Sequence, residues 1–189
     1  MKRFKPAYLL FLLFAFTLTN AQADEYQDTL DIFKNAAGSS EFFKQSYGYG
    51  VFPTISKVGF VIGGGGGNGR VYENGKYVGD TSMGQLSIGL QLGAQGFSQI
   101  VFFEDKSAFD EFTSGNFEFS ADVSAVVVTA GASASGGTAG STAGASGTKD
   151  HAAIQGEYVK GMATFVVIKG GLMYEAVLAG QKFEYTPLK

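Results

Sequence analysis

A short segment around Asn74-Gly75 constrains the fold of this chain more than any other feature. The pair is flanked by Val71-Tyr72-Glu73 and Lys76-Tyr77-Val78, two runs rich in β-branched and aromatic residues. Asn-Gly accepts the positive φ angles of a type I′ turn, so the segment predicts a β-hairpin with a two-residue loop. Such a hairpin places Glu73 opposite Lys76 and Tyr72 opposite Tyr77, and both are favourable cross-strand pairs.

Most of the remaining chain is also typical of β-structure. Strand patterns cover residues 58–62, 83–92, 98–103, 117–129, 163–168, 172–178 and 181–185. We expect Gly170-Gly171 to turn the chain between two of these strands, and residues 181–185 to form an edge strand. Helical periodicity is confined to residues 24–47 and 105–113. The predicted fold class is α+β, mainly an antiparallel sandwich or barrel with an N-terminal helical segment and one short internal helix.

The two helical segments carry their own start and stop signals. Gly38 divides the first segment, and Ser39 or Ser40 is the expected N-cap of a short second helix over residues 41–46. In the internal helix, Asp105 or Ser107 is the expected cap. Phe109 and Phe112 have the spacing of a buried face.

Glycine dominates two further segments. The tract Gly63–Gly67 follows the strand pattern at 58–62 and lets strands bend or backbones approach closely, so Gly65→Val is expected to cost at least about 1 kcal/mol. A binding loop is the alternative. Residues 131–147 are almost entirely Gly, Ala, Ser and Thr, which predicts a flexible insert or, alternatively, a tightly packed strand of small residues.

The N-terminus has the pattern of a secretory signal peptide. Lys2, Arg3 and Lys5 precede an apolar run over 7–18 and the triplet Ala21-Gln22-Ala23. We expect cleavage after Ala23, which leaves one domain over residues 24–189; an uncleaved anchor is the alternative. The chain contains no cysteine, which excludes disulfides, thiol catalysis and a lipidated cysteine. The expected location is therefore periplasmic or secreted.

Common catalytic and cofactor motifs are missing or incomplete. Gly64, Gly66 and Gly69 match the dinucleotide fingerprint, but a hairpin follows them instead of the helix that would hold a pyrophosphate. His151 is the only histidine, and no serine lies in a nucleophile elbow. No spacing of metal ligands is present. We therefore expect a non-enzymatic protein without cofactor or metal.

An aromatic strip with nearby cations is the best candidate for a binding surface. Interfacial membrane contacts combine such residue types, and the alternative is an internal lid over the open end of a barrel. Removing residues 1–23 removes three basic residues and no acidic one, so the mature chain is more acidic than its formal charge of −3 and is not expected to bind nucleic acid. The candidate lipid-binding residues are Phe42, Phe43, Lys44, Tyr47, Tyr49, Phe52, Lys57, Arg70 and Lys76.

Several segments together resemble a known family. Residues 46–64 (SYGYGVFPTISKVGFVIGG), 91–95 (QLGAQ), Tyr158-x-x-Gly161 and 170–176 (GGLMYEA) look like the SYLF lipid-binding domain, whose members include actin-binding yeast endocytic proteins. The resemblance implies binding to anionic lipid through an amphipathic N-terminal segment and basic residues, to which residues 24–47 and Lys57 correspond. The sequence thus predicts an extracytoplasmic module that binds membrane lipid peripherally and weakly. The alternative is an envelope protein, structural or stress-related, whose partner is another protein.

Overall fold

The structure is a computed structural model that describes residues 25–59, 62–88, 93–119, 125–128, 141–142, 156–171 and 180–189. The predicted signal peptide (1–23), the strand predicted at 172–178 and His151 lie outside the described residues. The same holds for the insert at 131–147, apart from two residues.

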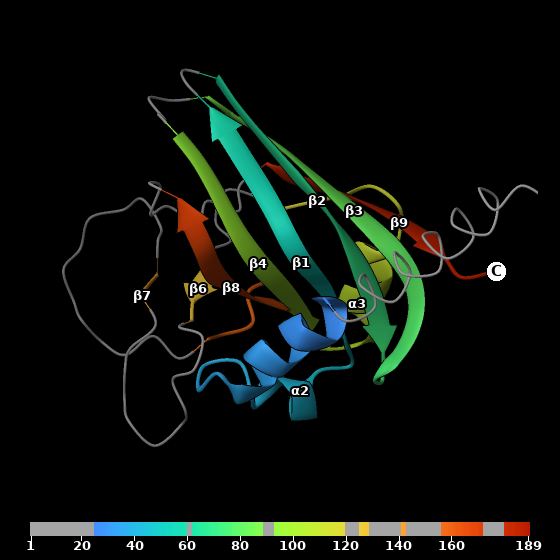
Figure 1. Ribbon diagram of the computed structural model, residues 1–189. Coiled ribbons are helices and arrows are strands. Elements are labelled where there is room, and N and C mark those ends of the chain that lie inside the picture. Colours follow the sequence, from blue (N-terminus) through green and yellow to red (C-terminus); the bar gives the residue numbers. More distant parts are fainter. Residues whose placement is uncertain are drawn as a thin grey trace, which may run out of the picture.

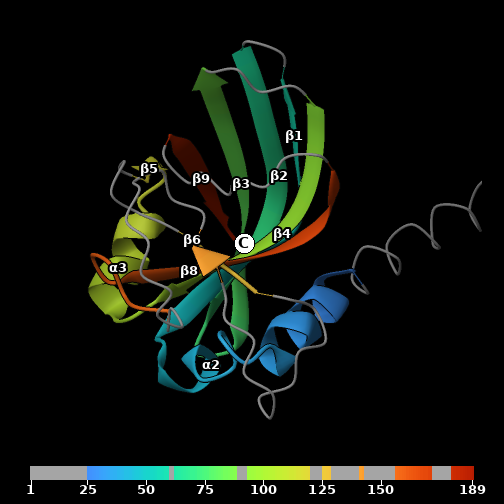
Figure 2. The same ribbon diagram turned by 90° about the vertical axis from the view of Figure 1, so that its left-hand side faces the viewer.

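One strongly curved, nine-stranded sheet forms a half-barrel (Figures 1 and 2). The strand order is β5-β9-β3-β2-β1-β4-β8-β6-β7, and every pair is antiparallel except β6 with β8. The strands are β1 (Gly48–Gly59), β2 (Ile62–Glu73), β3 (Lys76–Ile88), β4 (Gly93–Phe103), β5 (Phe117–Glu118), β6 (Ala125–Val127), β7 (Ser141–Thr142), β8 (Met162–Gly171) and β9 (Gln181–Pro187).

The predicted fold class and hairpin are confirmed. The sheet is mainly antiparallel, and Tyr72 pairs with Tyr77 and Glu73 with Lys76 around the turn. Asn74 and Gly75 adopt φ angles of 48° and 78°, the positive values that an Asn-Gly turn requires.

Two local predictions about strands are wrong. Gly170 and Gly171 lie within β8, where they pair with Gly96 and Gln95 of β4 instead of turning the chain. Strand β9 is not at the edge, because it lies between β5 and β3. In both cases the pairing with a strand distant in sequence decides the outcome. The tract Gly63–Gly67 lies inside β2, where it allows the close approach of backbones that the sequence predicts.

The helices follow the predicted segments. Residues 25–35 form the N-terminal helix, α2 spans Phe42–Gln45 and α3 spans Lys106–Phe112. Of the two predicted caps of α3, Asp105 is the one that forms, because its carboxylate accepts from the Ala108 N–H at 2.9 Å. The predicted serine caps of α2 are wrong: its N-cap is Glu41, without a side-chain bond. Ser39 instead donates to the Phe33 carbonyl at 2.6 Å, where the N-terminal helix ends.

The helices cover opposite faces of the sheet (Figure 2), and each face has its own core. We call the face that packs against α3 the inner face; Phe52, Phe112 and Phe183 are buried there. The outer face packs against the N-terminal helix through Phe33, and Phe165 is buried there. This division follows from strand alternation, since neighbouring residues point to opposite faces.

A pair of glutamines joins two distant strands across the inner face. Gln99 on β4 and Gln181 on β9 are fully buried, and β1, β2 and β3 lie between their strands in the sheet. Each amide donates to the other, with N–O distances of 3.0 and 3.2 Å. The two amides therefore satisfy one another in the interior, where an unpaired amide is costly.

Candidate functional site

The outer face of β2, β3 and β9 extends beyond the N-terminal helix and carries a hollow. The volume of this hollow is about 410 Å³. Its floor comes from side chains that are neighbours in the β2–β3–β9 ladder. The lining residues are Tyr26, Asn68, Gly69, Arg70, Tyr77, Asp80, Thr81, Ser82, Glu184 and Thr186.

Arg70 is held between two tyrosine rings in this hollow. Its guanidinium carbon lies 4.2 Å from the ring centre of Tyr26 and 5.0 Å from that of Tyr77. The hydroxyl of Tyr77 donates to Asp80 at 2.6 Å; burial, and then this hydrogen bond, raises the pKa of Tyr77 to about 12. Among the described residues Arg70 makes no ion pair. The stacking therefore orients a planar set of donors that suits an oxyanion.

The opposite end of the same strands is apolar. Val58 on β1 and Leu86 on β3 are 61% and 81% exposed, unusually high values for side chains of this kind. Gly64 pairs with both residues, so Val58 and Leu86 lie on one face with the glycine between them. Two strand spacings separate them by roughly 10 Å. We call these two residues the apolar pair.

The predicted aromatic strip is not one surface. Phe52 is fully buried on the inner face, whereas Tyr49, 9% exposed, lies in the outer core. Phe42 and Phe43 on α2 are half-buried, with ring centres 5.5 and 4.9 Å from that of Phe102. These rings therefore pack against the cores on the two faces of the sheet and do not form one exposed surface.

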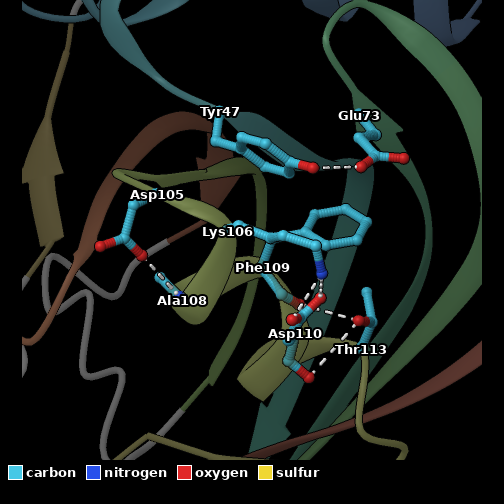
Figure 3. A network of polar contacts seen from close by, with 8 residues as sticks. All are labelled: Tyr47, Glu73, Asp105, Lys106, Ala108, Phe109, Asp110 and Thr113. Carbon is cyan, nitrogen blue, oxygen red and sulfur yellow. Dashed lines mark hydrogen bonds and ion pairs between the residues drawn. The ribbon is translucent and has the colours of Figure 1, made fainter.

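Tyr47, the remaining aromatic residue, lies beside α3 (Figure 3). Its hydroxyl donates to Glu73, and its ring packs against Phe109 with the centres 5.6 Å apart. In the same network Lys106 pairs with Asp110 within α3, at 2.6 Å. Tyr47 therefore joins β1 to the turn region of β2 and to α3, a structural role.

The four predicted cations lie in different parts of the fold. Lys44 is exposed on α2, 3.0 Å from Glu41, and Lys76 is exposed at the start of β3. Lys57 is buried on the inner face, 3% exposed, and Arg70 lies in the hollow on the outer face. The structure therefore does not bring the cations and the aromatic strip together.

The apolar pair was not singled out from the sequence. Leu86 lies in an alternating pattern, which normally marks a buried face, and Val58 lies in a short apolar run. Only the strand register shows that both residues point away from the inner face. The absence of acidic residues in the flanking segments 54–66 and 83–88 was the available signal.

The described residues contain no cluster of three or more His, Asp or Glu that could hold a metal ion. Within the same part of the chain, no helix is long and apolar enough to cross a membrane.

Burial of Tyr49 predicts a dependence of stability on alkaline pH. Burial raises the pKa of Tyr49 to about 12, so the fold favours the neutral phenol. This preference contributes fully to the stability of the fold below about pH 10, the pKa of tyrosine in the unfolded chain. The contribution is lost as the pH rises toward 12, and the total loss is roughly 2 to 3 kcal/mol. We expect Tyr49→Phe to reduce this loss in urea unfolding followed by circular dichroism. An equal stability difference between variant and wild type at neutral pH and above pH 10 would contradict the assignment.

The half-barrel, with a core on each face of its sheet and a polar hollow on the outer face, defines an α+β protein. Residues 84–183, more than half of the chain, match the family model Ysc84, described as "Las17-binding protein actin regulator". The chain belongs to this family, and the resemblance to the SYLF domain is confirmed. It is also similar to Beta cell expansion factor A of Aeromonas veronii, with 28% identity over 154 residues. The match covers 80% of this chain and 51% of that relative, so the chain spans about half the relative's length.

Proposed function

We propose that this protein is a non-enzymatic module that binds membrane lipid peripherally, outside the cytoplasm, after removal of residues 1–23. The observation that carries the proposal is the apolar pair, whose two side chains are presented to solvent from one face of the sheet. Family membership is consistent with it, because the family description names a regulator and not a catalyst.

The strand segments around the apolar pair carry few charges. Residues 54–66, 83–88, 93–99 and 164–171 contain no Asp or Glu. Their lysines are Lys57, which is buried on the inner face, and Lys169, whose ammonium lies 3.6 Å from the Glu25 carboxylate of the N-terminal helix. The strands themselves therefore add no acidic repulsion when the apolar pair approaches an anionic bilayer, and the binding relies on the apolar contact. The α2 end is less suitable, because Glu41, Glu73 and Asp105 lie near its lysines in the sequence.

Two inserted aliphatic side chains support weak association. Burial of one such side chain is worth about 1.5 to 3 kcal/mol at full transfer, and part of each residue is already covered. We expect Val58→Ser/Leu86→Ser to lower the partition coefficient for vesicles about tenfold to a hundredfold. The measurement is co-sedimentation with phosphatidylcholine vesicles, with and without anionic lipid. It uses protein recovered after export, whose first residue is expected to be Asp24.

Two variants make this experiment specific. Leu188→Ser is the matched control, because Leu188 is 50% exposed and lies far from Val58 and Leu86 along the strands, beside Val78. It is expected to sediment like wild type. Lys44→Ser/Lys76→Ser tests the α2 end, and loss of binding in this variant alone would move the contact there. If wild type stays in the supernatant with every vesicle, the proposal fails and a protein partner replaces the lipid.

A further inference from the structure

Glycines on the two faces of β2 and β3 meet different surroundings. On the inner face, a Cβ at Gly65 would lie 2.6 Å from Lys57 Cγ, and one at Gly67 would lie 2.5 Å from the Thr54 carbonyl oxygen. On the outer face, a Cβ at Gly84 would meet nothing within 4 Å and one at Gly64 would come no closer than 3.9 Å to any atom, whereas one at Gly66 would lie 3.0 Å from the Met83 carbonyl oxygen. Gly64 and Gly84 do not have a positive φ. Packing and backbone geometry therefore do not explain these two glycines, although glycine weakens a strand.

Gly66 and Gly84 lie between the hollow and the apolar pair. The pairs Arg70–Asp80, Asn68–Ser82, Gly66–Gly84 and Gly64–Leu86 follow one another along the β2–β3 ladder without a register shift. All of them share the outer face, and Arg70 and Gly64 are roughly 20 Å apart along the strand. Along the strands, the outer face therefore changes from polar side chains at the hollow, to glycines without side chains, to the apolar side chain of Leu86.

The charges in the hollow select the kind of headgroup. The lining combines the Arg70 guanidinium with the carboxylates of Asp80 and Glu184. A polyanion would be repelled by two carboxylates, and a simple cation by the guanidinium. A zwitterion satisfies both, with its oxyanion on Arg70 and its ammonium near the carboxylates. Asn68, Ser82 and Thr186 supply further hydrogen-bonding groups.

We propose that the outer face of β2 and β3 binds one zwitterionic amphiphile lengthwise. The phosphate of the headgroup lies against Arg70 and its ammonium against Asp80 and Glu184. The apolar tail runs over the smooth backbone at Gly66 and Gly84 to Leu86. This inference rests on the proposed lipid-binding function and adds to it a headgroup class and a path for a single lipid chain.

The test uses monomeric probes, so that it is separate from vesicle binding. Short-chain lysophosphatidylethanolamine below its critical micelle concentration is titrated into the protein by calorimetry. The tail-free headgroup glycerophosphoethanolamine and the anionic lysophosphatidylglycerol are titrated in parallel. We expect the zwitterionic amphiphile to bind at least about tenfold more tightly than either. Arg70→Gln is expected to weaken binding of both ethanolamine probes.

Gly84→Val tests the path of the tail. The valine projects into open space, so the melting temperature is expected to stay unchanged or to rise, while the tail loses its contact with the backbone. We expect a loss of at least about tenfold in lysophosphatidylethanolamine affinity and no change for glycerophosphoethanolamine. Gly96→Val is the matched control: Gly96 also meets nothing within 4 Å but lies on β4, away from this path.

The outcomes separate this inference from the proposed function. Equal affinities of Gly84→Val, Gly96→Val and wild type for the amphiphile would overturn the path. The headgroup assignment would be overturned if lysophosphatidylglycerol bound more tightly than lysophosphatidylethanolamine. It would also be overturned if Arg70→Gln left the affinity for the ethanolamine probes unchanged. Vesicle binding without monomer binding would overturn this inference and leave the proposed function intact. Monomer binding without vesicle binding would support the site and refute peripheral membrane association.

Discussion

Substituting valine for Gly67 is expected to lower the free energy of unfolding by about 3 kcal/mol. A Cβ at this position would lie 2.5 Å from the Thr54 carbonyl oxygen and 2.9 Å from Ile55 Cγ1. Ile55 is fully buried, and Thr54 is part of the neighbouring strand β1. The backbone of β2 must therefore move away from the backbone of β1, and a packed sheet resists this movement. The measurement is urea unfolding followed by circular dichroism.

Gly84→Val is the control, because the same substitution on the neighbouring strand meets open space. It is expected to retain wild-type stability. The sequence predicts that Gly65→Val costs at least about 1 kcal/mol. A Cβ at Gly65 would lie 2.6 Å from Lys57 Cγ, so this variant is expected to lose stability as Gly67→Val does. Equal stability of the Gly67 and Gly84 variants would show that the close approach of β1 and β2 is not required.

Replacing Gln99 with leucine is expected to cost about 3 kcal/mol, because it removes two hydrogen bonds and leaves the buried amide of Gln181 without them. Gln99→Leu/Gln181→Leu removes both amides together. We therefore expect the double variant to be more stable than either single variant, within about 1 kcal/mol of wild type.

A double-mutant cycle measures this coupling from four urea unfolding curves. If the two single losses simply add in the double variant, the glutamines act independently and do not link β4 to β9. The m-value serves as a control on the comparison, since an unchanged slope shows that the same surface is exposed on unfolding.

The parts of the fold that depend on neighbouring residues could be predicted from the sequence. The Asn74-Gly75 hairpin and the capped helix α3 are set by turn and cap chemistry, and both are confirmed. The position of β9 could not be predicted, because its partners on β3 lie about a hundred residues earlier. The glycine signal at 170–171 is ambiguous for the same reason: only a distant partner strand decides between a turn and a strand.

The candidate site was harder to predict for two reasons. Tyr49 and Phe52 point to opposite faces of β1 by ordinary strand alternation, so closeness in sequence did not mean a shared surface for the aromatic residues. The pairing of β1 then shifts register before Ile55 and Ser56, and from there odd-numbered residues such as Ile55 point inward, as even-numbered Phe52 does. Conversely, Val58 and Leu86 are distant in sequence and share a row only through Gly64.

The place of β9 also determines when the fold can be completed. This strand follows both of its partners in the sequence, yet it lies between β5 and β3 and carries Phe183 of the inner core. Its contacts span more than a hundred residues, as in the bond from Thr81 to the Glu184 carbonyl. Sheets dominated by such distant contacts fold slowly. Residues 181–187 must therefore leave the ribosome before the half-barrel can close its inner core, however early β1 to β4 are synthesised.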